Sequence, residues 1–200
     1  MKIVFLCMVL AMLGSKPVLG QARLSIPKGR PIMVDGKFSD REWVDARTLL
    51  VRDSIRLYFK QTKEYVYIGI QPLAKEYSSG WIDLFVADEG QGIYNLHASR
   101  KLGERRLADG QWEGWKEWWT NEGSWRANYS RPDDIRESDR WKVVQLKDEG
   151  WEFQISKRRF SSSQWKIMFD ISLMFQEVAN IKYPAAVADT TPDAWLQLRL

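Results

Sequence analysis

The chain has 200 residues, of which 44% are hydrophobic and 28% charged, and its formal net charge is +4. This composition is that of a globular protein, and it excludes collagen, coiled coils and intrinsic disorder. The excess of basic residues is too small to require a nucleic acid as partner.

The first twenty residues have the pattern of a secretory signal peptide. A basic residue precedes an apolar run over residues 3–13, and small residues at 18–20 stand before Gln21. The run is too short for a membrane anchor, and no later stretch reaches the ~20 apolar residues of a transmembrane helix. We therefore predict that residues 1–20 are removed. Residues 21–200 are expected to form one exported domain, periplasmic or extracellular, without a membrane span.

The one cysteine, Cys7, lies in this leader. Its removal would leave the mature chain without a thiol, so neither a disulfide nor a thiolate zinc site is expected. Burial of a core has to stabilise the domain.

Alternating apolar and polar residues predict a series of strands. Residues 54–61 and 65–71 alternate on either side of a polar break, which is typical of a hairpin. Residues 81–87 repeat the pattern, and a turn at Asp88 to Gly92 leads into a partner strand over residues 93–99. Further strands are expected at residues 30–34, 141–146, 151–156, 165–171 and 195–200.

One short helix is predicted. Ser39 to Glu42 has the spacing of a capping box, in which the Ser39 side chain accepts a hydrogen bond from the Glu42 amide. So few helical signals exclude parallel βαβ units. Eight or nine antiparallel strands that each bury one face predict an all-β, immunoglobulin-like antiparallel sandwich. Residues 100–140 are the least regular and are either a functional excursion or partly structured.

Three separated pieces of the chain carry short motifs. In residues 32–43 an apolar strand meets Asp-Gly and then Glu-Trp. The second piece is the predicted hairpin of residues 54–71 followed by Trp81 to Asp88, a mostly apolar segment with one internal acidic residue and a final Asp. The third piece, residues 183–200, begins with an aromatic residue and a proline and ends in the last predicted strand. In this order and spacing, the motifs resemble the family 9 carbohydrate-binding modules and their DOMON-like β-sandwich relatives.

The resemblance implies an exported, non-catalytic module that binds an oligo- or polysaccharide, as an accessory to polysaccharide breakdown or uptake. Family members grip a sugar between two aromatic side chains. By position these correspond to Tyr77 and Tyr183, where tryptophan is more usual in the family. The acidic residue that holds sugar hydroxyls corresponds to Asp83, which alternation places opposite the apolar face of its strand.

Eleven tryptophans offer flat apolar faces suited to sugar rings. Trp118 is expected to be an exposed platform and a secondary part of the sugar site, as is Trp81, which shares its strand face with Asp83. Trp195 also shares its face with polar residues, so it too is expected on a wet sheet surface.

The other tryptophans have structural interpretations. Helical spacing would place Trp112, Trp115 and Trp119 on one side of a short amphipathic helix packed on the sandwich. Core positions are expected for three tryptophans that lie beside apolar residues, Trp43, Trp151 and Trp165.

The one histidine, His97, leaves alternatives open. A structural role is one, and an axial haem ligand in an electron-transfer domain, as in some DOMON relatives, is the other. A methionine would complete the haem site, and the candidates are Met33, Met168 and Met174. A third class of function is an envelope protein-interaction module whose sugar site has decayed.

Paired carboxylates at residues 88–89, 133–134 and 148–149 all fall in predicted turns, where acids usually face water. Glycosidases need two carboxyls across a cleft, so we expect no enzyme. An alternative role for the Asp88 to Gly92 turn is a calcium site built from oxygen ligands alone, although the spacing of its possible ligands matches no known calcium loop. No other cofactor is expected.

Overall fold

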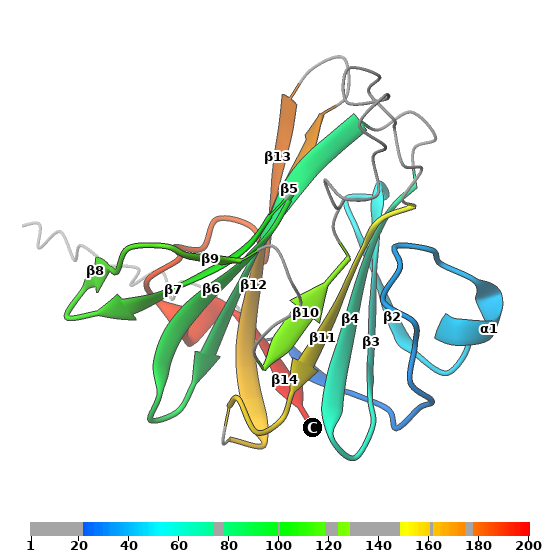
Figure 1. The fold of residues 1–200 in the computed structure, drawn as a ribbon, viewed down its shortest axis with the longest axis horizontal. Coiled ribbons are helices and arrows are strands. Elements are labelled where there is room, and N and C mark those ends of the chain that lie inside the picture. Colours follow the sequence, from blue (N-terminus) through cyan, green and yellow to red (C-terminus); the bar gives the residue numbers. More distant parts are fainter. Residues whose placement is uncertain are drawn as a thin grey trace, which may run out of the picture.

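The alternating segments pair into two β-sheets that lie face to face in a computed structural model of the chain (Figure 1). The structure describes residues 22–73, 78–99, 101–118, 124–128, 149–160, 162–174 and 178–200. The predicted all-β sandwich is confirmed. Within these residues, no helix has the length and apolar character needed to cross a membrane.

The larger sheet, sheet A, has the strand order β1-β14-β12-β5-β6-β7-β8, with β13 also paired to β12 and β9 to β7. Neighbours are antiparallel except for β1, which runs parallel to β14. Its strands are β1 (Arg23–Ser25), β5 (Ser78–Asp88), β6 (Gly92–Ala98), β7 (Leu102–Ala108), β8 (Gln111–Trp112), β9 (Lys116–Trp118), β12 (Gln164–Met174), β13 (Val178–Tyr183) and β14 (Leu196–Arg199).

The smaller sheet, sheet B, has the order β10-β11-β4-β3-β2 and is antiparallel throughout its described strands. The strands are β2 (Arg47–Val51), β3 (Ile55–Gln61), β4 (Tyr65–Pro72), β10 (Trp125–Ala127) and β11 (Trp151–Ser156). Both predicted hairpins are confirmed, as β3 with β4 and β5 with β6.

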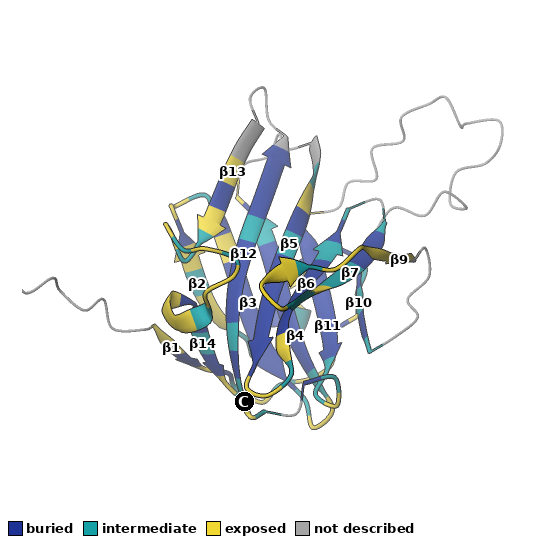
Figure 2. Cartoon of the chain, turned by 90° about the vertical axis from the view of Figure 1, so that its left-hand side faces the viewer, coloured by how far each residue is buried: buried dark blue, intermediate teal, exposed yellow. Residues whose placement is uncertain are grey.

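The main core lies between the sheets, where every second residue of the central strands points inward. Figure 2 shows these buried residues along β3, β4, β11 and β12. Phe59 of sheet B meets Phe169 of sheet A edge to face, with ring centroids 6.3 Å apart. Trp43, Trp151 and Trp165 are buried as predicted. Each large side chain buried in this way stabilises the fold by about 1.5 to 3 kcal/mol.

Residues 30–46, here called the N-terminal cover, pack on the face of sheet B that is turned away from sheet A. They include the short helix α1 (Asp40–Trp43), and Phe38 and Trp43 join Tyr58 and Tyr67 of the sheet in a second cluster. A Cβ on Gly69 would lie 2.7 Å from Phe38 Cε1. Glycine at this position therefore lets the cover approach β4 closely.

Two buried charged side chains hold the cover in place. Glu152 of β11 accepts hydrogen bonds of 2.9 Å each from the Asp35 amide, the Gly36 amide and Trp43 Nε1. Lys60 of β3 donates to the Glu42 carbonyl and, at 2.8 Å, to Asp45 Oδ1. Both side chains are fully buried, so these bonds satisfy groups that water does not reach.

Two local predictions for this region are wrong. Residues 30–34 form no strand, because Ile32 points into the second cluster and the segment lies over sheet B instead of pairing within it. Ser39 does not cap α1 through its side chain. Its carbonyl accepts from the Glu42 amide at 3.0 Å, while Ser39 Oγ donates to the Glu42 carboxylate at 3.4 Å.

The irregular stretch of residues 100–140 is partly structured, since it contains β7, β8, β9 and β10. The amphipathic helix predicted there is wrong, because Trp112 pairs with Leu107 as part of β8 and Trp115 lies just before β9. The strand predicted at residues 141–146 lies outside the described residues, as does Trp119.

Candidate functional site

The face of sheet A that is turned away from sheet B, here called the outer face, carries two of the predicted site residues. Ile82 and Leu84 of β5 are fully buried in the core, so the alternate residues Trp81 and Asp83 point to the outer face. Trp81 is 39% exposed, which confirms the wet surface predicted for it.

Strand register surrounds Asp83 with polar partners. On β6 His97 is directly opposite, with Nδ1 2.9 Å from Asp83 Oδ1 and Nε2 3.0 Å from Ser99 Oγ. On β12 the opposite residue is Asp170, which pairs with Lys182 of β13 at 3.4 Å. Each of the two facing carboxylates thus has its own partner, a hydrogen bond to His97 for Asp83 and an ion pair with Lys182 for Asp170.

Trp115 lies next to His97 on the outer face. It is 41% exposed, and its ring meets the His97 ring edge to face with centroids 5.5 Å apart. The ring also lies close to Gly103, where a Cβ would be 3.4 Å from Trp115 Cε3. A pocket of about 160 Å³ opens here, lined by His97, Ser99, Lys101, Leu102, Gly103, Trp115 and Glu117.

Trp81 precedes Asp83 by two residues on β5 and Trp115 contacts His97, so the two exposed indoles lie on the same face as the pair of Asp83 and His97. Adjacent strands are about 4.8 Å apart, so β5, which carries Trp81, and β7, against which Trp115 lies, are separated by roughly 10 Å.

Tyr183, another of the predicted site residues, does not join this surface. Tyr183 pairs with Phe169, whose side chain is in the core, and it packs half-buried against the core on the face opposite to that of Asp83. Burial raises the pKa of the Tyr183 phenol. Tyr77 and the Trp118 side chain lie outside the described residues.

Trp195 is fully buried, so the wet surface predicted for it is wrong. It packs with Phe85 and Met168 under the segment that leads into β14, and its Nε1 donates to the Ala188 carbonyl at 2.9 Å. The part of the outer face around Trp195 is thus covered by the segment before β14, whereas the part around Trp81 is exposed.

The two ring nitrogens of His97 both have oxygen partners. Nδ1 is bonded to Asp83 and Nε2 to Ser99 Oγ, so binding of iron at Nε2 would require displacement of the Ser99 hydroxyl. Of the candidate methionines, Met168 is fully buried beside Trp195 and Met33 is 68% exposed on the N-terminal cover. The Met174 side chain lies outside the described residues.

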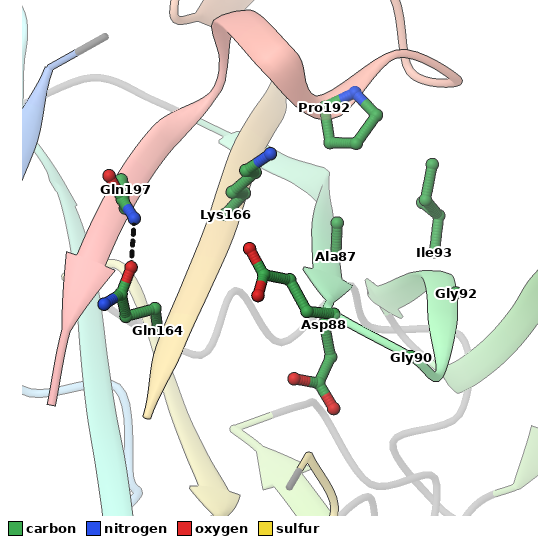
Figure 3. Close-up of a pocket in the computed structure, with 10 residues that line it drawn as sticks. Ala87, Asp88, Gly90, Gly92, Ile93, Gln164, Lys166, Pro192 and Gln197 are labelled. Atoms are coloured by element: carbon green, nitrogen blue, oxygen red, sulfur yellow. Dashed lines mark hydrogen bonds between the residues drawn. The ribbon is translucent and has the colours of Figure 1, made fainter. Parts of the chain in front are cut away.

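A second pocket, of about 220 Å³, lies at the turn between β5 and β6 (Figure 3). It is lined by Asp88, Gly90, Gln164, Lys166 and Gln197 among others, and no aromatic ring is found among the described residues of its wall. Asp88 does not face water as expected of a turn acid, because it is 4% exposed and accepts from the Ser162 amide at 3.1 Å. The pocket therefore offers no stacking surface to a sugar.

Three carboxylates with ligand atoms within 4.8 Å of one another, those of Asp35, Glu42 and Glu152, form a group that fits a cation by distance. Two of these carboxylates already accept hydrogen bonds from the protein. Glu152 accepts from donors of the N-terminal cover, and Glu42 accepts from the Met33 amide. Glu152 and Glu42 thus have structural partners.

Comparison with known proteins gives one structural similarity. No protein-family model matches the chain, and no curated protein sequence matches it. A solved structure of a family 9 carbohydrate-binding module from Caldicellulosiruptor kristjanssonii, in complex with cellotriose, is similar with a TM-score of 0.49 and 10% identity. The match covers 89% of this chain and 93% of that one. The matched protein belongs to the family that the three sequence motifs resemble.

Proposed function

We propose that the chain is a non-catalytic carbohydrate-binding module that binds sugar on the outer face of sheet A. The observation that carries the proposal is the pair of exposed indoles, Trp81 and Trp115, on the same face as the hydrogen-bonded Asp83 and His97. Sugar sites combine flat aromatic faces with a few fixed polar groups.

Each part of the site has a distinct role in this proposal. The indole faces of Trp81 and Trp115 cover the C–H side of a pyranose, and the carboxylates of Asp83 and Asp170 accept hydrogen bonds from its hydroxyls. Because Asp83 is fixed by His97, its free oxygen is oriented before the ligand arrives, which lowers the entropy lost on binding.

The signal-peptide pattern of residues 1–20 and the three sequence motifs support a role outside the cytoplasm in the use of polysaccharides. We infer that the module is exported and acts as an accessory to polysaccharide breakdown or uptake. An aromatic surface of this kind would hold a catalytic partner on its insoluble or oligomeric substrate.

Removal of either indole is expected to weaken sugar binding about tenfold or more. Each covered ring face contributes on the order of 1 to 2 kcal/mol at ~25 cal/mol per Å². The measurement is a calorimetric titration, with ligands chosen from a glycan array, of the unmutated protein and of Trp81→Ala and Trp115→Ala. Leu50→Ala is the control, because Leu50 is 52% exposed on sheet B.

Two further variants locate the site. Tyr77→Ala and Tyr183→Ala test the clamp implied by the family resemblance. If these two lose affinity and the tryptophan variants do not, the sugar binds at the clamp and the outer-face site is wrong. If the unmutated protein binds no glycan on the array, the proposed function itself is wrong.

A further inference from the structure

Arg105 of β7 lies beside the proposed sugar site, over two tryptophan rings. Its guanidinium carbon is 4.7 Å from the ring centroid of Trp112 and 4.5 Å from that of Trp115. Trp115 is also the ring that walls the pocket next to His97. The guanidinium and the sugar site therefore share one aromatic side chain.

The acidic groups around this site already have basic partners. Asp83 is bonded to His97, Asp170 to Lys182, and Glu117 to Lys101 at 2.8 Å. In the part of the chain that the structure describes, no ion pair joins a carboxylate to Arg105, and its buried Nε has no hydrogen-bond partner. A half-buried guanidinium without a counter-charge is costly and suits an anionic ligand.

Asn95, next to Arg105 in the sheet, is a second buried polar group without a hydrogen-bond partner among the described residues. It lies on β6 directly opposite Arg105, it is 0% exposed, and both the nitrogen and the oxygen of its amide lack a partner. Most buried side-chain amides are hydrogen-bonded, and leaving one unpaired costs about 1 to 3 kcal/mol. The buried amide of Asn95 and the buried Nε of Arg105 are therefore unpaired polar groups on facing residues of β6 and β7.

We propose that the outer face recognises an acidic sugar unit, a uronate, whose carboxylate pairs with Arg105. The inference rests on the proposed function, and it names the class of sugar. The planar guanidinium matches a carboxylate through two parallel hydrogen bonds, and the rings of Trp112 and Trp115 hold that plane in a fixed orientation.

The test compares ligands that differ only in charge. Oligogalacturonides and oligoglucuronides are titrated calorimetrically against their methyl esters, at low salt and at high salt. The unmutated protein is expected to bind the free acid of at least one series about tenfold or more tightly than its ester, and added salt should reduce this preference.

Arg105→Gln and Arg106→Gln form a matched pair of variants. Both remove one positive charge from β7, but Arg106 lies over Tyr94, on the other face of the sheet. Arg105→Gln should lower the ratio of acid to ester affinity to about one, whereas Arg106→Gln should keep the ratio of the unmutated protein. Thermal melts check folding. If Arg105→Gln does not fold, Arg105→Lys replaces it, and the preference should fall because the lysine lacks the planar fork.

The outcomes separate this inference from the proposed function. Equal binding of acid and ester by the unmutated protein, or a preference that survives in Arg105→Gln, overturns the uronate inference and leaves sugar binding in place. Competition by inorganic sulfate or acetate, without a preference for the acidic sugar, assigns Arg105 to simple anions and also overturns it. Binding of no glycan at all overturns both.

Discussion

Replacing Glu152 by alanine is expected to destabilise the protein by about 3 to 5 kcal/mol. The carboxylate accepts hydrogen bonds from the Asp35 and Gly36 amides and from Trp43 Nε1. Each donor left unpaired in the interior costs about 1 to 3 kcal/mol. Because these donors belong to the N-terminal cover, the variant should also release the cover from sheet B. Chemical denaturation measures the loss.

Glu149→Ala is the matched control for this prediction. Glu149 also accepts a hydrogen bond of 2.9 Å from the cover, from the Phe38 amide, but Glu149 is exposed. Water can replace it, so we expect a loss of at most about 1 kcal/mol. Equal losses in the two variants would contradict the role assigned to burial at Glu152.

Stability is expected to fall as the pH rises from about 4.5 to above 7. Burial of Glu152 raises its pKa from 4.5 to about 7, against the opposing effect of its three donors. In this pH window the folded protein keeps a proton that the unfolded chain has released. The contribution is therefore complete below pH 4.5 and is lost as the pH rises through 7, and a shift of this size corresponds to roughly 3 kcal/mol.

The pH dependence is measured by urea denaturation at several values between pH 4.5 and 8.5. Glu152→Gln cannot titrate at this position, so its stability should change less over the same range. A slope that is identical in Glu152→Gln and in the unmutated protein would show that Glu152 is not the source of the pH dependence.

The sequence predicts the fold best where alternation is complete. The hairpins of β3 with β4 and β5 with β6 follow directly from apolar residues at every second position. Strand β7 is harder to recognise, because Glu104 points inward to accept from Trp125 Nε1 and to pair with Arg159. These partners are distant in the sequence, so periodicity does not reveal an inward-facing acid.

For the candidate site, the sequence places Trp81 and Asp83 on the same face but does not supply their neighbours. That His97 and Asp170 flank Asp83 depends on the register between strands, which local patterns do not determine. Spacing alone also misassigned Trp115, because three- and four-residue intervals occur by chance in a stretch of short strands. The burial of Trp195 depends on the segment before β14 folding back over the sheet.

The alternation of outer-face and core residues along β5 limits how this surface can evolve. A shift of β5 by one residue in its register would turn Trp81 and Asp83 toward the core and bring Ile82 and Leu84 to solvent. Substitutions at outward positions leave the inward set untouched. Homologous proteins can therefore diverge in ligand preference by exchanging side chains on this face, while the lengths of the central strands stay fixed.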